Sequence, residues 1–345
     1  MTKIVLASDF HIRYTNPMDH VDENGVSSRL NEILDSLSWA VEIGKQHKAN
    51  IFISTGDVFD TSERLPTKEG LIIQETFKKI KENYKSVFFI PGNHDIISNE
   101  CNILTLFEPI IKVFSNPSYL DINGARLFFL PYVREPELFY STLEEFKKYN
   151  CFGKKYLFAH FWDSSVVSLD SEAIDLNKAD FNMFDKVFSG HYHSPSINTD
   201  NKIIYCGTLL NKKFNERGQK GAWILNCETE KITFYPNPLS PTFVTTKDIS
   251  ILNNAENLLE NAYYKVECSP ENILEVSKLL SKVKGYEIVS LQIISNEDKI
   301  ILDNVERKNT SGFKNYILNN CKLFLPEGVT EEEFKNAGTK FMENI

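Results

Sequence analysis

The stretch KVFSGHYH, residues 186–193, joins a short apolar run to two histidines that flank one tyrosine. In an extended backbone, side chains two positions apart point the same way, so His191 and His193 could face one ligand together. The same spacing also suits a pair that faces solvent or closes the end of a strand. The rest of the chain decides between these interpretations.

Four other short apolar runs resemble residues 186–190: 4–8, 51–55, 87–91 and 156–160. Continuous apolar runs of this length are typical of strands that are buried on both faces. Between the first three runs, apolar residues recur at helical spacing over 29–47 and again in a Lys/Glu-rich stretch that begins at Thr67. A further strand is predicted at 127–133. Strands that alternate with helices predict an α/β sheet.

Polar side chains that can bind metals follow or end five of the six predicted strands, all except 127–133. They are Asp9, His11, Asp57, Asp60, Asn93, His94, Asp95, His160, His191 and His193. In open α/β sheets, ligands bind at the carboxyl ends of the strands. Taken singly, a GD dipeptide is often a turn, GNHD can be a helix cap, and a lone histidine can belong to the core. Five such strand ends in one chain favour a metal site.

The donor set indicates the kind of metal. Imidazoles and carboxylates without thiolates favour Mn²⁺, Fe²⁺ or Zn²⁺ over Ca²⁺. Seven of these ten candidates, taken as ligands, are too many for one ion. They suit two ions, with water completing the coordination of each. A pair of ions roughly 3.5–4 Å apart is typical of enzymes that displace oxygen at phosphorus. One carboxylate must then bridge the ions, and Asp57, at the end of a central strand, is the candidate.

The ordered pattern D-x-H, GDxxD, GNHD, H and GHxH resembles the calcineurin-like metallophosphoesterases. The resemblance implies an α/β sandwich of central β-sheets flanked by helices. It implies that His94 faces the scissile phosphate and that the carboxylate of Asp60 orients His94, while Asp95 is a structural cap. It also implies two sets of metal ligands: Asp9, His11, Asp57 and His193 for the first ion, and Asp57, Asn93, His160 and His191 for the second.

Within that superfamily, GDVFDT (56–61) and YCGTLLNKKFNERGQKGAWIL (205–225) are similar to the SbcD-type nuclease subunits of double-strand-break repair complexes, and the short chain is closer to their phage-encoded members. This resemblance implies an Mn²⁺-dependent DNA exonuclease or endonuclease that acts on double-stranded ends in repair, recombination or replication, with Mg²⁺ or Fe²⁺ as alternative metals. It implies an SbcC-type coiled-coil ABC ATPase as partner and a homodimer within a heterotetramer. Two departures are Thr208, where the family often has serine, and the irregular segment 12–28.

Two other functions remain open at this point. A small-molecule phosphodiesterase or phosphatase could use the same site without DNA or a partner. A metal-free scaffold subunit could keep the fold alone, but such proteins typically lose ligands, and every ligand position here is filled.

The composition limits the classes of partner. A net charge of −9 argues against a free-standing, non-specific DNA binder, which would normally present a basic face. The six scattered cysteines form no C-x-x-C pair, which indicates reduced thiols. We expect no signal peptide and no membrane span, and therefore a cytoplasmic protein, or one in the host cytoplasm if it is encoded by a phage.

Three domains are predicted. Residues 1–245 carry the motifs and form the two-metal phosphoesterase domain. Residues 246–308 read as strand, helix and strand, which predicts a small α+β capping domain that faces DNA or, alternatively, an extension of the main sheet. Residues 309–345 predict two short amphipathic helices, which either bind the ATPase or pack on the protein's own core.

Overall fold

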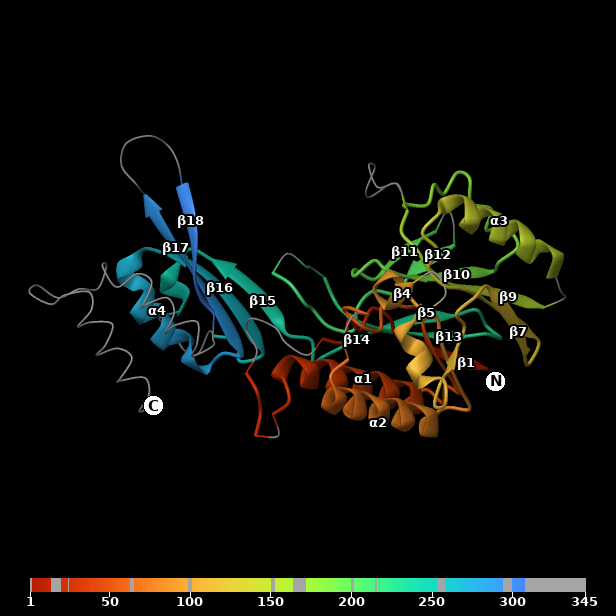
Figure 1. The fold of residues 1–345 in the computed structure, drawn as a ribbon, viewed down its shortest axis with the longest axis horizontal. Helices are drawn as coiled ribbons and strands as arrows, with labels where there is room; N and C mark the ends of the chain where they lie inside the picture. Colours follow the sequence, from red (N-terminus) through yellow and green to blue (C-terminus); the bar gives the residue numbers. More distant parts are fainter. Residues whose placement is uncertain are drawn as a thin grey trace, which may run out of the picture. The chain divides into compact units, whose positions relative to one another are not determined.

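The computed structural model describes residues 2–13, 20–23, 25–62, 65–98, 101–149, 153–163, 172–199, 202–214, 216, 218–252, 258–293 and 300–307. These residues form two compact units (Figure 1). The first contains the described parts of 1–14, 30–211 and 216–240, and the second contains the described parts of 15–29, 212–215 and 241–307. The helical tail predicted for 309–345 lies outside the described residues.

The first unit contains two six-stranded sheets. The first sheet has the order β14-β13-β1-β2-β3-β6, in which β1, β2, β3 and β6 run parallel and β13 and β14 are antiparallel to their neighbours. Its strands are β1 (Lys3–Leu6), β2 (Ile51–Ser54), β3 (Ser86–Phe89), β6 (Lys112–Val113), β13 (Gly221–Asn226) and β14 (Ile232–Pro236).

The second sheet has the order β11-β12-β10-β9-β8-β7, with β8, β9, β10 and β12 parallel. Its strands are β7 (Ser118–Ile122), β8 (Ala125–Leu130), β9 (Lys154–His160), β10 (Lys186–Gly190), β11 (Ser196–Asn198) and β12 (Ile203–Tyr205). All six strands predicted from apolar runs are therefore present, which confirms the α/β reading.

The two sheets pack face to face around one apolar core. Side chains from the first sheet, such as Leu6 and Ile53, join one buried cluster with Phe129 and Phe158 from the second. The Phe158 ring stacks on Phe188 of the neighbouring strand, with centroids 5.4 Å apart. Because helices cover the outer faces as well, the strands are apolar on both sides, which explains their continuous apolar runs.

Three helices lie in the first unit: α1 (Ser28–Gln46), α2 (Thr67–Asn83) and α3 (Pro136–Phe146). The α2 helix packs on the first sheet through Phe77, whose ring meets Phe89 edge-on. The α3 helix packs on the second sheet, where Phe146 contacts Phe128. The expected sandwich of sheets with flanking helices is thus confirmed (Figure 1).

The loops of the first unit carry short elements. These are η1 (Asn93–Asp95), β4 (Ile96–Ser98), β5 (Cys101–Asn102), η2 (Ile103–Phe107) and η3 (Lys147–Tyr149). The β4 and β5 strands pair with each other only, among the described residues. The η1 turn lies shortly after β3 and holds the last three residues of the GNHD motif, with Gly92 as its N-cap.

The second unit is a small α+β fold of its own. Its sheet has the order β15-β16-β17-β18, from β15 (Thr242–Thr246), β16 (Ala262–Cys268), β17 (Gly285–Ile293) and β18 (Ile300–Arg307). Its helical elements are η4 (Ile249–Leu252), η6 (Pro270–Asn272), α4 (Ile273–Leu279) and η7 (Leu280–Lys282). Val276 of α4 is fully buried with Val266 and Ile288 of the sheet. This sheet begins at Thr242, a few residues before the predicted boundary.

None of the helices among the described residues combines the length and the apolar character that crossing a bilayer requires.

Candidate metal centre

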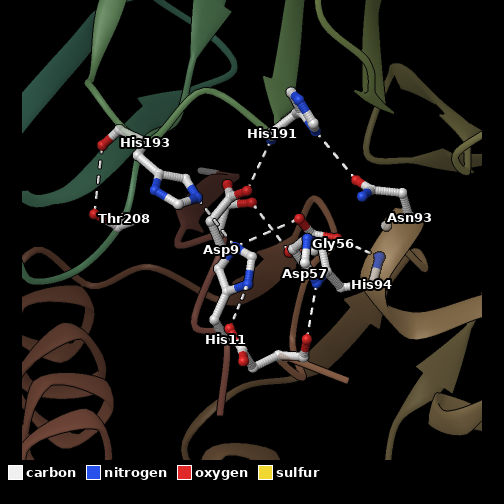
Figure 2. A network of polar contacts seen from close by, with 12 residues as sticks. Asp9, His11, Gly56, Asp57, Asn93, His94, His191, His193 and Thr208 are labelled. Carbon is white, nitrogen blue, oxygen red and sulfur yellow. Dashed lines mark hydrogen bonds and ion pairs between the residues drawn. The ribbon is translucent and has the colours of Figure 1, made fainter. Parts of the chain in front are cut away.

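Parallel strands bring the polar strand ends of the first unit together. Asp9 and His11 follow β1, Asp57 and Asp60 follow β2, and the GNHD turn follows β3. His160 ends β9, and the two histidines of GHYH follow β10. The ends of the two sheets meet, because the backbone N–H of His191 donates to Asp9 Oδ1 at 2.8 Å (Figure 2).

Glycines allow this close approach. A Cβ on Gly92 would lie 2.2 Å from Asp57 Oδ1, and a Cβ on Gly56 would lie 2.4 Å from His160 Nδ1. Gly56 also has φ +107°, a conformation that side chains strongly disfavour. The G of the GD and GNHD motifs therefore has a steric role, which is to leave room for the ligands of a neighbouring strand.

Four of the site residues adopt left-handed backbone conformations. The φ angles are +52° at Asp9, +43° at His11, +50° at Asp57 and +80° at His191. Such conformations are uncommon outside glycine and cost free energy that the surrounding structure must offset. Here they turn the side chains back toward the junction of the two sheets.

One group of ligand atoms comes from Asp9, His11 and His193, and these atoms lie within 4.8 Å of one another. The Nε2 atoms of His11 and His193 are 3.1 Å apart. Two nitrogens about 2.1 Å from one ion stand about 3.0–3.4 Å apart at ordinary coordination angles. The observed separation therefore matches the spacing that two ligands of a single ion would have.

A second group consists of Asp57, His160 and His191, again within 4.8 Å of one another. Asn93 completes this group: its Oδ1 lies 3.0 Å from His160 Nε2 and 3.1 Å from His191 Nδ1. Figure 2 shows Asn93 and His191 reaching toward each other. His160 Nδ1 donates to the Thr55 carbonyl at 2.8 Å, which leaves the Nε2 lone pair facing the group.

Asp57 lies between the two groups. Its Oδ2 is 3.4 Å from His11 Nε2, and its Oδ1 is 3.5 Å from His160 Nε2. The two oxygens of one carboxylate thus face the two sets of donors. This is the position that a bridging ligand requires.

His94 is exposed at the edge of the centre. Its backbone N–H donates to Asp57 Oδ1 at 3.0 Å, and its ring centroid is 4.8 Å from that of His11. Its Nδ1 lies 2.8 Å from the backbone carbonyl of Asp60. A carbonyl only accepts, so Nδ1 carries the proton and Nε2 remains for a substrate.

The contact between Asp60 and His94 differs in its atoms from the expected one. The backbone carbonyl of Asp60 orients His94, whereas its carboxylate accepts from Arg13 Nε at 3.1 Å and lies 3.5 Å from His11 Nδ1. Burial alone would raise the pKa of Asp60, but the hydrogen bonds from His11 and Arg13 hold it well below its usual range. Its carboxylate therefore stays ionised behind His11.

Asp95 joins the loops that follow two strands. Its Oδ1 accepts from the Phe59 N–H at 2.9 Å, and its Oδ2 accepts from the N–H groups of Val58 at 3.2 Å and Gly92 at 2.9 Å. Burial, aided by the charge of Asp57, raises the pKa of Asp95 to about 7. Asp95 thus has the role of a cap, as expected, and it holds two different loops together.

The electrostatics suit bound cations. Burial raises the pKa of Asp9, with the nearby Asp57 adding to the effect. For Asp57, the neighbouring imidazoles of His160 and His11 outweigh burial and lower the pKa. Burial, with His160 adding to it, lowers the pKa of His191 to about 3, so this imidazole is neutral. Buried carboxylates with neutral imidazoles fit divalent metal ions.

Several residues around the centre were missed by sequence reasoning. Trp162 stacks on the His191 ring, with centroids 4.0 Å apart and planes at 20°. Glu216 Oε1 lies 2.8 Å from His193 Nδ1. Arg13 donates to the carboxylate of Asp60, and the Thr55 carbonyl accepts from His160. The sequence alone could not have identified Glu216 as the carboxylate behind His193, because the two residues are 23 positions apart and only the fold brings them together.

Known proteins similar to this chain include one phage protein and two solved structures. Exonuclease subunit 1 of Enterobacteria phage T4 is 26% identical over 214 residues, which is 59% of this chain and 61% of that protein, so the match spans about three fifths of the relative's length. Two solved structures cover 68% of the chain. One is a novel archaeal phosphodiesterase (15% identity, TM-score 0.35, 99% of its own chain) and the other is Yfce, a phosphoesterase from E. coli (13% identity, TM-score 0.34, 100% of its own chain).

The sequence profile of the calcineurin-like phosphoesterases matches residues 2–195, which include both groups of donors and His94. The match covers more than half of the chain. With the two-sheet sandwich and the strand-end donors, it establishes that the chain belongs to the calcineurin-like phosphoesterase family.

Proposed function

We propose that this protein is a two-metal nuclease that hydrolyses phosphodiester bonds in DNA, with Mn²⁺ as the working metal. The observation that carries the proposal is the pair of donor groups that share Asp57. In this assignment Asp9, His11, Asp57 and His193 hold one ion, and Asp57, Asn93, His160 and His191 hold the other. Bound there, the ions supply Lewis-acid polarisation of the phosphate and a more acidic attacking water.

His94 supplies the proton chemistry. Because Nδ1–H is engaged with the Asp60 carbonyl, Nε2 is the nitrogen that meets the substrate. In its protonated form the ring donates from Nε2 to the leaving oxygen, while the carbonyl still accepts from Nδ1–H. The bond from the His94 backbone to Asp57 keeps this ring beside the metal ligands. One positioned acid of this kind contributes roughly 10²–10⁴-fold to the rate.

The choice of DNA as substrate rests on the relationship to a phage exonuclease subunit. We propose double-stranded ends as the substrate, in DNA repair, recombination or replication, and the host cytoplasm as the compartment if the gene is viral. With a net charge of −9, the chain needs its metals or a partner to attract a polyanion. We propose that an SbcC-type coiled-coil ATPase supplies this attraction, in an assembly built on two copies of each chain.

The direct test is a nuclease assay on a linear duplex labelled at one end. The full chain is incubated with Mn²⁺, Mg²⁺ or EDTA, with and without the partner ATPase, and in parallel with a nitrophenyl phosphodiester reporter. We expect Mn²⁺-dependent shortening of the duplex that the ATPase increases. Reporter hydrolysis without any cutting of DNA under all conditions would overturn the nuclease and favour a small-molecule phosphodiesterase.

A truncation tests the proposed domain roles. We propose that residues 246–308 cap the active site toward DNA and that residues 309–345 bind the ATPase. Deletion of 309–345 should leave a folded, Mn²⁺-dependent nuclease that no longer co-purifies with the ATPase. Full-strength binding of the partner by the truncated chain, or its aggregation, would contradict this assignment.

A further inference from the structure

A buried pair of charged residues lies behind His193. Lys220 has a side chain that is 0% exposed, and its Nζ lies 3.6 Å from Glu216 Oε2. The same Nζ donates to the backbone carbonyl of His193 at 2.6 Å. Burying an ammonium group is costly unless an anion and hydrogen bonds compensate for it. This pair is therefore a costly arrangement placed directly against a candidate metal ligand.

The two oxygens of Glu216 have different partners. Oε2 faces Lys220, while Oε1 lies 2.8 Å from His193 Nδ1. A lone pair on Nδ1 would repel a carboxylate oxygen at this distance, so Nδ1 must carry a proton. In the neutral ring the remaining lone pair is then on Nε2, the atom that lies 3.1 Å from His11 Nε2. The carboxylate thus selects the tautomer that can bind a cation.

The backbone of His193 is held from a second direction. The Thr208 N–H donates to the His193 carbonyl at 3.2 Å, and this is the same oxygen that Lys220 contacts. The Thr208 Oγ1 lies 3.4 Å from that oxygen as well (Figure 2). Neither the carbonyl nor the imidazole of His193 can move without breaking these bonds. At Nδ1, His160 faces a backbone carbonyl, whereas His193 faces a carboxylate, as His11 does with Asp60.

We propose that Glu216 is a positioning residue for one of the two metal ions: held by Lys220, it fixes the orientation and the tautomer of His193. The inference rests on the proposed two-metal function and assigns this role within it. A carboxylate behind a metal-binding histidine typically contributes 10–100-fold to metal affinity. Loss of Glu216 should lower the affinity for the ion held by Asp9, His11 and His193. The affinity for the second ion should not change.

The test compares Glu216→Gln and Glu216→Ala in the full chain. The glutamine keeps the size and one oxygen acceptor of Glu216 but loses the charge. The alanine loses the acceptor and the charge. Glu228→Gln is a matched control, because Glu228 accepts the N–H of Thr2 at 3.0 Å at the opposite end of β1. Mn²⁺ binding is measured by calorimetry, and electron paramagnetic resonance separates coupled ion pairs from single ions. Thermal melting of the metal-free proteins checks the fold.

We expect the wild type and the control to bind two Mn²⁺ ions as a coupled pair. In the alanine variant one ion should bind about 10–100-fold more weakly, and the spectrum of a single ion should replace that of the pair, with the glutamine variant in between. Two ions bound by the alanine variant at wild-type affinity would overturn this inference alone. A wild type that binds no pair of ions would overturn the proposed function and this inference with it.

Discussion

Replacing Asp95 with alanine removes the acceptor of three buried backbone N–H groups. These belong to Val58 and Phe59, in the loop after β2, and to Gly92, after β3. The carboxylate is 0% exposed, so water does not replace it without a change in the packing. The loops that it joins carry Asp57 and His94.

The magnitude follows from these contacts. Each buried donor left unsatisfied costs about 1–3 kcal/mol, so three donors give a range of about 3–9 kcal/mol. The raised pKa of Asp95, about 7, shows that burial disfavours its charged form, and the loss of that unfavourable group offsets part of the cost. We therefore expect the lower half of the range, about 3–6 kcal/mol of unfolding free energy.

Asp95→Asn is the graded comparison. When the asparagine oxygen takes the place of Oδ2, it still accepts from the N–H groups of Val58 and Gly92. The asparagine NH₂ group then faces the Phe59 N–H, which loses its acceptor. Its loss should therefore be about that of one unsatisfied donor, or about 1–3 kcal/mol.

The assay is urea unfolding in EDTA, followed by tryptophan fluorescence. All three tryptophans, at positions 39, 162 and 223, lie in the first unit, so the signal reports the unfolding of the unit that contains Asp95. Stability should decrease from wild type to asparagine to alanine. A loss below about 1 kcal/mol in the alanine variant would refute the reasoning that the three N–H groups depend on this side chain.

Four other perturbations test the centre. Asp57→Ala should abolish nuclease activity and the coupled Mn²⁺ signal, because the shared carboxylate is lost; a variant that still binds an ion pair would contradict the bridging role. His94→Ala should lose roughly 10²–10⁴-fold in kcat and keep both ions, which single-turnover kinetics and calorimetry check together. Gly92→Ala should lose the second ion, since its Cβ would lie 2.2 Å from Asp57 Oδ1; unchanged Mn²⁺ stoichiometry would count against that steric role. Mn²⁺ at 100-fold over its dissociation constant should stabilise the protein by about 2.7 kcal/mol for each bound ion relative to EDTA, and equal melting curves would argue against metal binding.

The sequence by itself determined the strands and the chemical character of the site. Continuous apolar runs identified β1, β2, β3, β9 and β10, because strands covered on both faces need apolar residues at every position. Parallel neighbours place their carboxyl ends at one edge, so residues that follow such strands come together whatever their separation along the chain. For this reason the sequence could predict that these side chains gather at one place, whereas their division into two sets of metal ligands came from the family resemblance and stays a prediction.

Only the tertiary structure decided which atoms support those ligands. The partner of His94 is the backbone carbonyl of Asp60, and the partner of His160 is the carbonyl of Thr55, 105 residues away. A backbone acceptor is present at every residue and therefore leaves no mark in the sequence. Glu216 contacts His193 because of the course of the chain after β12. Neither hydrophobic periodicity nor a sequence motif predicts that course. The identities of the ligands follow from local pattern, whereas their orientation depends on long-range packing.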